Sequence, residues 1–121
     1  MVQDVSPGRQ GEIPPVLMFG FERSGTTLLS MMVGAHPDIA VPLSTAGMWY
    51  RLMKKVERHP QPSREWLADQ LLAEERIRLW DAPLDRAGIL SRMEAARISH
   101  AFAALHMVYA SCKGKRHWAS M

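Results

Sequence analysis

Near the start of the chain, apolar residues form a short unbroken run and then recur at helical spacing. Residues 16–19 read Val-Leu-Met-Phe, apolar on both faces, which is typical of a buried parallel strand. Gly20 ends the run, and residues 25–34 have the spacing of a helix. The helix is expected to turn these residues inward: Leu28, Leu29, Met31 and Met32. The pattern therefore predicts a strand, a short polar loop and a helix in succession.

The rest of the chain is predicted to be helical, apart from a very short second strand at 39–41. Helices are predicted over 44–59, 63–80 and 92–112, with a short one capped by Asp85. Their predicted buried faces contain Met48, Trp49, Leu52, Met53, Val56, Leu67, Leu71, Leu72, Leu79, Ile89, Leu90, Ile98, Ala101, Phe102, Leu105, Val108 and Cys112. The predicted fold class is therefore α/β, with one central parallel strand, mostly helices and an incomplete sheet.

Length and composition indicate one domain. Residues 1–15 are rich in proline, glycine and polar residues, so we expect a disordered leader before a domain at 16–121. The net charge is +3, but the lysines and arginines form no dense run, which argues against a nucleic-acid partner. The single cysteine excludes an internal disulfide, and neither a signal peptide nor a membrane span is evident. A cytoplasmic location is expected.

The loop between the first strand and the first helix has the composition of an anion-binding loop. Residues 20–27, Gly-Phe-Glu-Arg-Ser-Gly-Thr-Thr, place two glycines and two hydroxyl residues where backbone N–H groups and a helix N-terminus can surround a phosphate or sulfate. A P-loop nucleotide kinase would have lysine at Thr26, so that class is disfavoured. Arg23 is the only cation in the loop, and its planar guanidinium can bind two oxygens of one tetrahedral group. An ordinary strand-to-helix turn is the alternative.

At these residues the chain resembles sulfotransferases that use 3′-phosphoadenosine 5′-phosphosulfate (PAPS), particularly their bacterial and tyrosylprotein-type branch. In that branch a strand is followed by G-x-x-R-S-G-T-T-L and, about one helix later, by H-P-D. The matching residues here are Gly20, Arg23, Ser24, Gly25, Thr26, Thr27, Leu28, His36, Pro37 and Asp38. A fainter match to Y-A-x-x-x-G-K-x-x-W involves Tyr109, Ala110, Gly114, Lys115 and Trp118.

The resemblance implies a P-loop-like, three-layer sulfotransferase fold, of which this chain would be the N-terminal part. It implies that the 5′-phosphosulfate of PAPS is bound by Arg23, Ser24, Gly25, Thr26 and Thr27. It further implies a catalytic role for Arg23, which would stabilise charge on the bridging oxygen as the sulfuryl group moves to a hydroxyl or amine. The acceptor would be a small molecule or a peptide.

Two departures from the family pattern shape these expectations. The branch often has a glutamate, a candidate general base, soon after its second strand, whereas this chain has Ser44 and Thr45 in that region. The family's residues for the 3′-phosphate of PAPS would lie beyond Met121, so we expect the chain alone to be inactive. A non-catalytic anion-binding fragment is the alternative. No metal is expected, because the histidines at 59, 100, 106 and 117 lack helical i, i+4 spacing.

Overall fold

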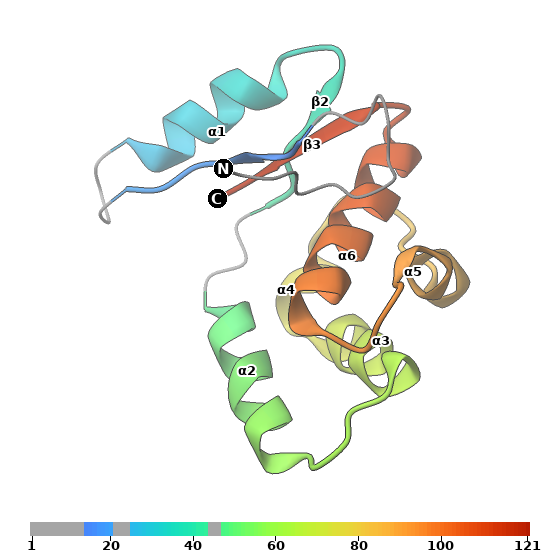
Figure 1. The fold of residues 1–121 in the computed structure, drawn as a ribbon. Helices are drawn as coiled ribbons and strands as arrows, with labels where there is room; N and C mark the ends of the chain where they lie inside the picture. Colours follow the sequence, from blue (N-terminus) through green and yellow to red (C-terminus); the bar gives the residue numbers. More distant parts are fainter. Residues whose placement is uncertain (1–13, 21–24, 44–46) are drawn as a thin grey trace, which may run out of the picture.

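A small parallel sheet lies beside a group of helices in the structure, a computed structural model that describes residues 14–20, 25–43 and 47–121 (Figure 1). The predicted leader falls outside these residues except for Pro14 and Pro15. The elements in chain order are β1 (Val16–Leu17), α1 (Thr26–Gly34), β2 (Ile39–Ala40), α2 (Met48–Arg58), α3 (Arg64–Ala73), α4 (Glu75–Arg78), α5 (Arg86–Arg92), α6 (Ile98–Cys112) and β3 (His117–Ser120). The predicted α/β class is confirmed.

The sheet is built around its last strand. Its order is β1-β3-β2 and both pairings are parallel, with Leu17 opposite Ser120 and Ala40 opposite Trp118. The strands predicted near residues 16 and 39 are therefore present, although each is only two residues long. The prediction that the first of them is buried is wrong, because Val16 and Leu17 are exposed in this small sheet. The sequence analysis did not predict β3, and this strand, rather than β1, is central among the described residues.

The prediction that α1 turns its large apolar side chains inward is wrong. No residue of α1 is buried, and the exposed fractions of Leu28, Met31 and Met32 are 63%, 68% and 65%. Leu29 is exposed as well. The reason is the size of the sheet: with outer strands of two residues, the described sheet offers α1 little surface to cover.

The main core lies among the helices and is centred on α6, which packs against α3, α5 and β3. Most of the predicted helix faces are confirmed, and the largest fully buried side chains are Met48, Leu52, Leu67, Leu71, Ile89, Leu105 and His106. Met53 and Cys112 are exposed, contrary to prediction. Cys112 lies in the last turn of α6, where its Sγ is 3.6 Å from the Pro83 carbonyl oxygen.

Two predicted helix boundaries are wrong for identifiable reasons. The helix predicted over 63–80 is interrupted at Glu74, whose extended backbone (ψ 134°) separates α3 from α4 and leaves Leu79 exposed. The Glu74 carboxylate accepts a 2.8 Å hydrogen bond from Arg51. The helix predicted from residue 92 begins at Ile98 instead, because α5 continues to Arg92. Arg64 donates to the carbonyl oxygens of Leu90, in the last turn of α5, and of Met93, the residue after it.

His106 is fully buried within an aromatic cluster. Its ring centroid is 4.5 Å from those of Phe102 and Trp118, with Trp80 edge-on at 5.3 Å. Its Nδ1 lies 2.8 Å from the Phe102 carbonyl oxygen, which can only accept, so Nδ1 carries the proton. Nε2 has no hydrogen-bond partner among the described residues. Burial lowers the pKa of His106 to about 4, and the bond to Phe102 opposes that shift in part.

We predict that stability falls as the pH is lowered from 6.5 towards 4. Because the folded-state pKa of His106 lies below 6.5, the unfolded chain binds a proton in this range that the folded chain does not. The full effect of the pKa difference is roughly 3 kcal/mol. His106→Phe, which keeps a ring in the cluster, should flatten the dependence between pH 6.5 and 5 in urea unfolding. An unchanged slope in this variant would contradict the assignment.

Candidate anion-binding site

The site is formed where β1 leads into α1. Gly25 precedes the helix with φ +93°, in the left-handed region that only glycine adopts without strain. Among the described residues no side chain caps the helix, and its first turn contains no acidic residue, so the leading N–H groups can serve an external acceptor. The helix dipole adds partial positive charge at the same point. This is the local geometry that binds a phosphate or sulfate.

The sheet directs two chain segments to the same edge as this helix start. Leu17 of β1 is paired with Ser120 of β3, and the Met18 N–H donates a 2.8 Å hydrogen bond to the Ser120 carbonyl oxygen. The carboxyl ends of both parallel strands therefore reach the edge from which the loop to Gly25 departs. In open α/β sheets, ligands bind outside the carboxyl ends of the strands.

Three of the five predicted binding residues are described, and the structure brings them together. Gly25, Thr26 and Thr27 are consecutive at the start of α1, and Thr26 is half-buried whereas Thr27 is exposed. Arg23 and Ser24 lie outside the described residues, as do Ser44 and Thr45 at the position of the family glutamate. A Cβ added at Gly25 would meet nothing within 4 Å, so this side of the helix start is open.

The His-Pro-Asp motif lies at the opposite end of α1 and is a structural link to β3. Asp38 accepts from the Arg116 side chain through Oδ2 and from the Arg116 backbone N–H through Oδ1, at 2.8 and 3.2 Å. Its carbonyl oxygen accepts from the His117 N–H at 3.0 Å. The Arg116 guanidinium lowers the pKa of Asp38 to about 2, so this link is ionised at neutral pH. No motif or periodicity in the sequence indicated this role of Arg116.

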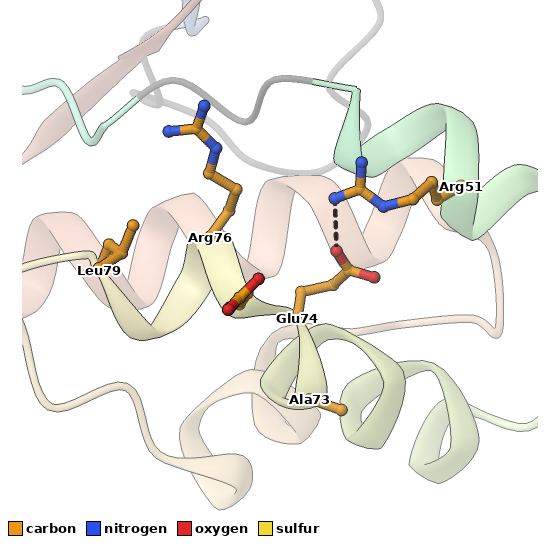
Figure 2. Close-up of a pocket in the computed structure, with 6 residues that line it drawn as sticks. Arg51, Ala73, Glu74, Arg76 and Leu79 are labelled. Carbon is orange, nitrogen blue, oxygen red and sulfur yellow. Dashed lines mark hydrogen bonds and ion pairs between the residues drawn. The ribbon is translucent and has the colours of Figure 1, made fainter.

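A shallow pocket of about 550 Å³ lies between α2 and α4 (Figure 2). Of its lining elements, α2 is the one that follows the segment 44–46 in the sequence, beginning at Met48. The pocket is lined by Arg51, Ala73, Glu74, Glu75, Arg76 and Leu79. Arg51 is paired with Glu74, whereas Arg76 has no ion-pair partner within the described ranges. With two arginines and two glutamates, the lining is polar but electrically balanced, so it favours neither anions nor cations.

The part of the chain that the structure describes contains neither a cluster of metal ligands nor a membrane-spanning helix. No group of three or more histidine, cysteine, aspartate or glutamate side chains gathers there in a way that could bind a metal ion. None of the helices described is both long enough and apolar enough to cross a membrane.

Comparison with known proteins identifies one family. The sequence profile described as the sulfotransferase family matches residues 14–120, which is nearly the whole chain. Searches of curated proteins and of solved structures find no significant match. The family match extends from β1 through β3, so it includes the loop, α1 and the helical region together.

We predict that Gly25→Ala loosens the start of α1. Alanine costs about 1 to 2 kcal/mol in the left-handed conformation, so hydrogen exchange of the α1 amides should rise roughly 10-fold. Gly25→Asn should exchange at an intermediate rate, since asparagine tolerates this conformation better. Gly34→Ala is the control: its added Cβ would meet Val41 Cβ at an ordinary 3.5 Å. Equal exchange in the two alanine variants would show that Gly25 is not conformationally required.

Proposed function

Because the chain belongs to the sulfotransferase family, we propose that it transfers a sulfuryl group from PAPS to a hydroxyl or amine of a small-molecule or peptide acceptor. The supporting observation is the start of α1, beside the carboxyl end of β1: Gly25 is left-handed, the first turn has no acidic residue, and no side chain of the described residues caps its N–H groups. These features suit a tetrahedral dianion and disfavour a cation.

PAPS, when bound, would supply the sulfuryl group: the acceptor atom would form a bond to sulfur and lose its proton, while the bond from sulfur to the 5′-phosphate oxygen would break and release adenosine 3′,5′-bisphosphate. The proposed task of the chain is to hold the anion in line for this transfer and to offset charge that grows on the departing oxygen. Backbone N–H groups at Gly25, Thr26 and Thr27 would hold the ground-state oxygens. Arg23, as the one cation of the loop sequence, would act on the departing oxygen.

We predict that adenosine 3′,5′-bisphosphate, the product derived from PAPS, binds more tightly than ATP. The loop lacks the lysine with which P-loop enzymes reach the outer phosphates, so ATP gains little from its longer chain. Isothermal calorimetry with and without Mg²⁺ measures both affinities. Tighter binding of ATP that depends on Mg²⁺ would favour a kinase-like enzyme. Binding of the bisphosphate without any turnover of PAPS by the full-length enzyme would favour a non-catalytic anion-binding protein.

We predict that in the full-length enzyme Arg23→Ala lowers kcat by roughly 100-fold or more, by analogy with the loss of one oxyanion-hole donor. Ground-state binding should weaken less, because the backbone N–H groups at the start of α1 remain. Arg23→Lys should recover part of the rate, since it keeps the charge but not the planar fork. Arg58→Ala, which removes one exposed positive charge from α2, is the control. A raised KM with unchanged kcat would make Arg23 a binding residue only.

A further inference from the structure

The position of α1 needs an explanation, because the helix buries no residue of its own. Its contacts are with β2 and β3, and its large apolar side chains are exposed. Apolar packing, which fixes the helices α3, α5 and α6, therefore contributes little to the placement of α1. We therefore attribute the position of α1 against the sheet to polar contacts at one end of the helix.

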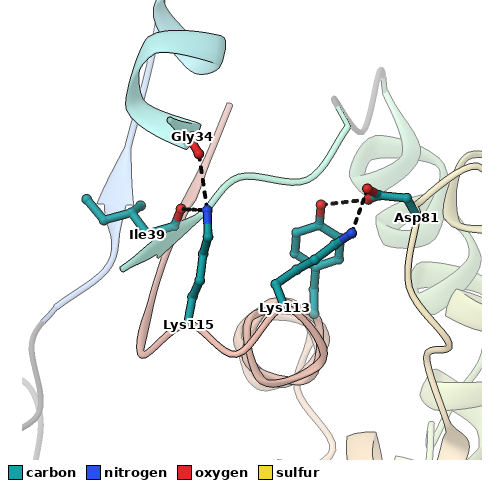
Figure 3. A network of polar contacts seen from close by, with 6 residues as sticks. Gly34, Ile39, Asp81, Lys113 and Lys115 are labelled. Carbon is teal, nitrogen blue, oxygen red and sulfur yellow. Dashed lines mark hydrogen bonds and ion pairs between the residues drawn. The ribbon is translucent and has the colours of Figure 1, made fainter. Parts of the chain in front are cut away.

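Those contacts converge on Lys115, in the short connection between α6 and β3. Its Nζ donates to the carbonyl oxygens of Gly34 at 3.1 Å, His36 at 3.2 Å and Ile39 at 3.0 Å, as Figure 3 shows for the first and last. An ammonium has three N–H donors, so all of its hydrogen-bonding capacity is directed at the turn that ends α1 and begins β2. Gly34 is the last residue of α1, where the helix dipole is negative and a cation is favourable.

The connection that carries Lys115 is itself fixed. Gly114 has φ +68°, and the Lys115 N–H donates to the Ala110 carbonyl oxygen at 2.9 Å. The next residue, Arg116, pairs with Asp38. The carboxyl end of α1 is thus attached to the start of the central strand, while its amino end faces the candidate anion site.

We propose that Lys115 is a positioning residue for the anion-binding loop: by holding the carboxyl end of α1 to the sheet, it sets where the N–H groups at the amino end lie. This inference rests on the proposed function, because the affected ligand is the 5′-phosphate group bound at Gly25 to Thr27. Lys115 does not touch that ligand in this proposal and acts through the helix.

Lys113 provides a matched control two residues away. It carries the same charge, but its Nζ donates to Asp81 Oδ2 at 2.6 Å, on the side of α6 away from Gly34 and Ile39 (Figure 3). Tyr109 donates to the other oxygen of the same carboxylate at 2.8 Å. Lys113 therefore links α6 to the segment before α5 and makes no contact with α1.

The test compares Lys115→Met, Lys115→Arg and Lys113→Met by two measurements: calorimetric affinity for adenosine 3′,5′-bisphosphate and hydrogen exchange over residues 26–40. Lys115→Met should weaken binding roughly 10-fold or more and speed exchange in this segment, because three hydrogen bonds to a charged group are lost. Lys113→Met should bind within about 2-fold of the wild type and leave exchange at 26–40 unchanged, since its lost contact is far from the helix. Lys115→Arg, which keeps the charge with a different donor geometry, should be intermediate.

Equal loss of affinity in Lys115→Met and Lys113→Met would overturn the proposal, because it would show a general effect of charge. Wild-type affinity in Lys115→Met would overturn it too. If Lys115→Met does not fold, Lys115→Arg decides by the same two measurements, and wild-type values for both would refute the role. If the wild-type protein does not bind the bisphosphate, the proposed function fails, whereas the exchange comparison still tests whether Lys115 holds α1.

Discussion

The pairing of β3 with both other strands is the constraint on which the described fold depends. Strands of two residues cannot exist alone, because their N–H and C=O groups need partners. Val16–Leu17 and Ile39–Ala40 both find those partners on His117–Ser120. The same pairing aligns β1 with the start of α1 and places β2 beside the carboxyl end of that helix. β3 also packs on α6, so together with the buried Ala40 of β2 it joins the region of the anion-binding loop to the helical core.

The core and the candidate site are stabilised by different kinds of interaction. The helices α3, α5 and α6 are held by apolar and aromatic packing, with His106 among the rings. Around α1 the contacts are mostly polar: the Lys115 ammonium on three carbonyl oxygens, and the Asp38–Arg116 pair. Such contacts are directional, which suits a site whose donors must meet a tetrahedral anion from fixed directions. They also leave the exposed side of α1 unconstrained by packing.

Sequence reasoning predicted what depends on local pattern and missed what depends on distant partners. The strand and helix at the start and the buried faces around Leu52, Leu67 and Leu105 all follow from local residue types. The strand at 117–120 was missed because four residues of mixed polarity carry no periodic signal, and only β1 and β2 make them a strand. The predicted burial of Leu28 and Met31 was wrong because a helical pattern in the sequence does not reveal how much sheet surface is available for the helix to cover. Arg23 stays a prediction.

The central position of the last strand also determines the order in which parts of this protein can fold as it is made. The helices from Met48 to Cys112 have mostly local contacts, so they can form while synthesis continues. The sheet cannot, because in the part of the chain that the structure describes β1 and β2 both pair with β3, so they wait until residues 117–120 have been added. At a synthesis rate of about 5 to 20 residues per second, β2 waits on the order of 4 to 15 s for its partner. During that interval two short apolar strands are unpaired on the nascent chain, which makes them natural sites for chaperones to engage.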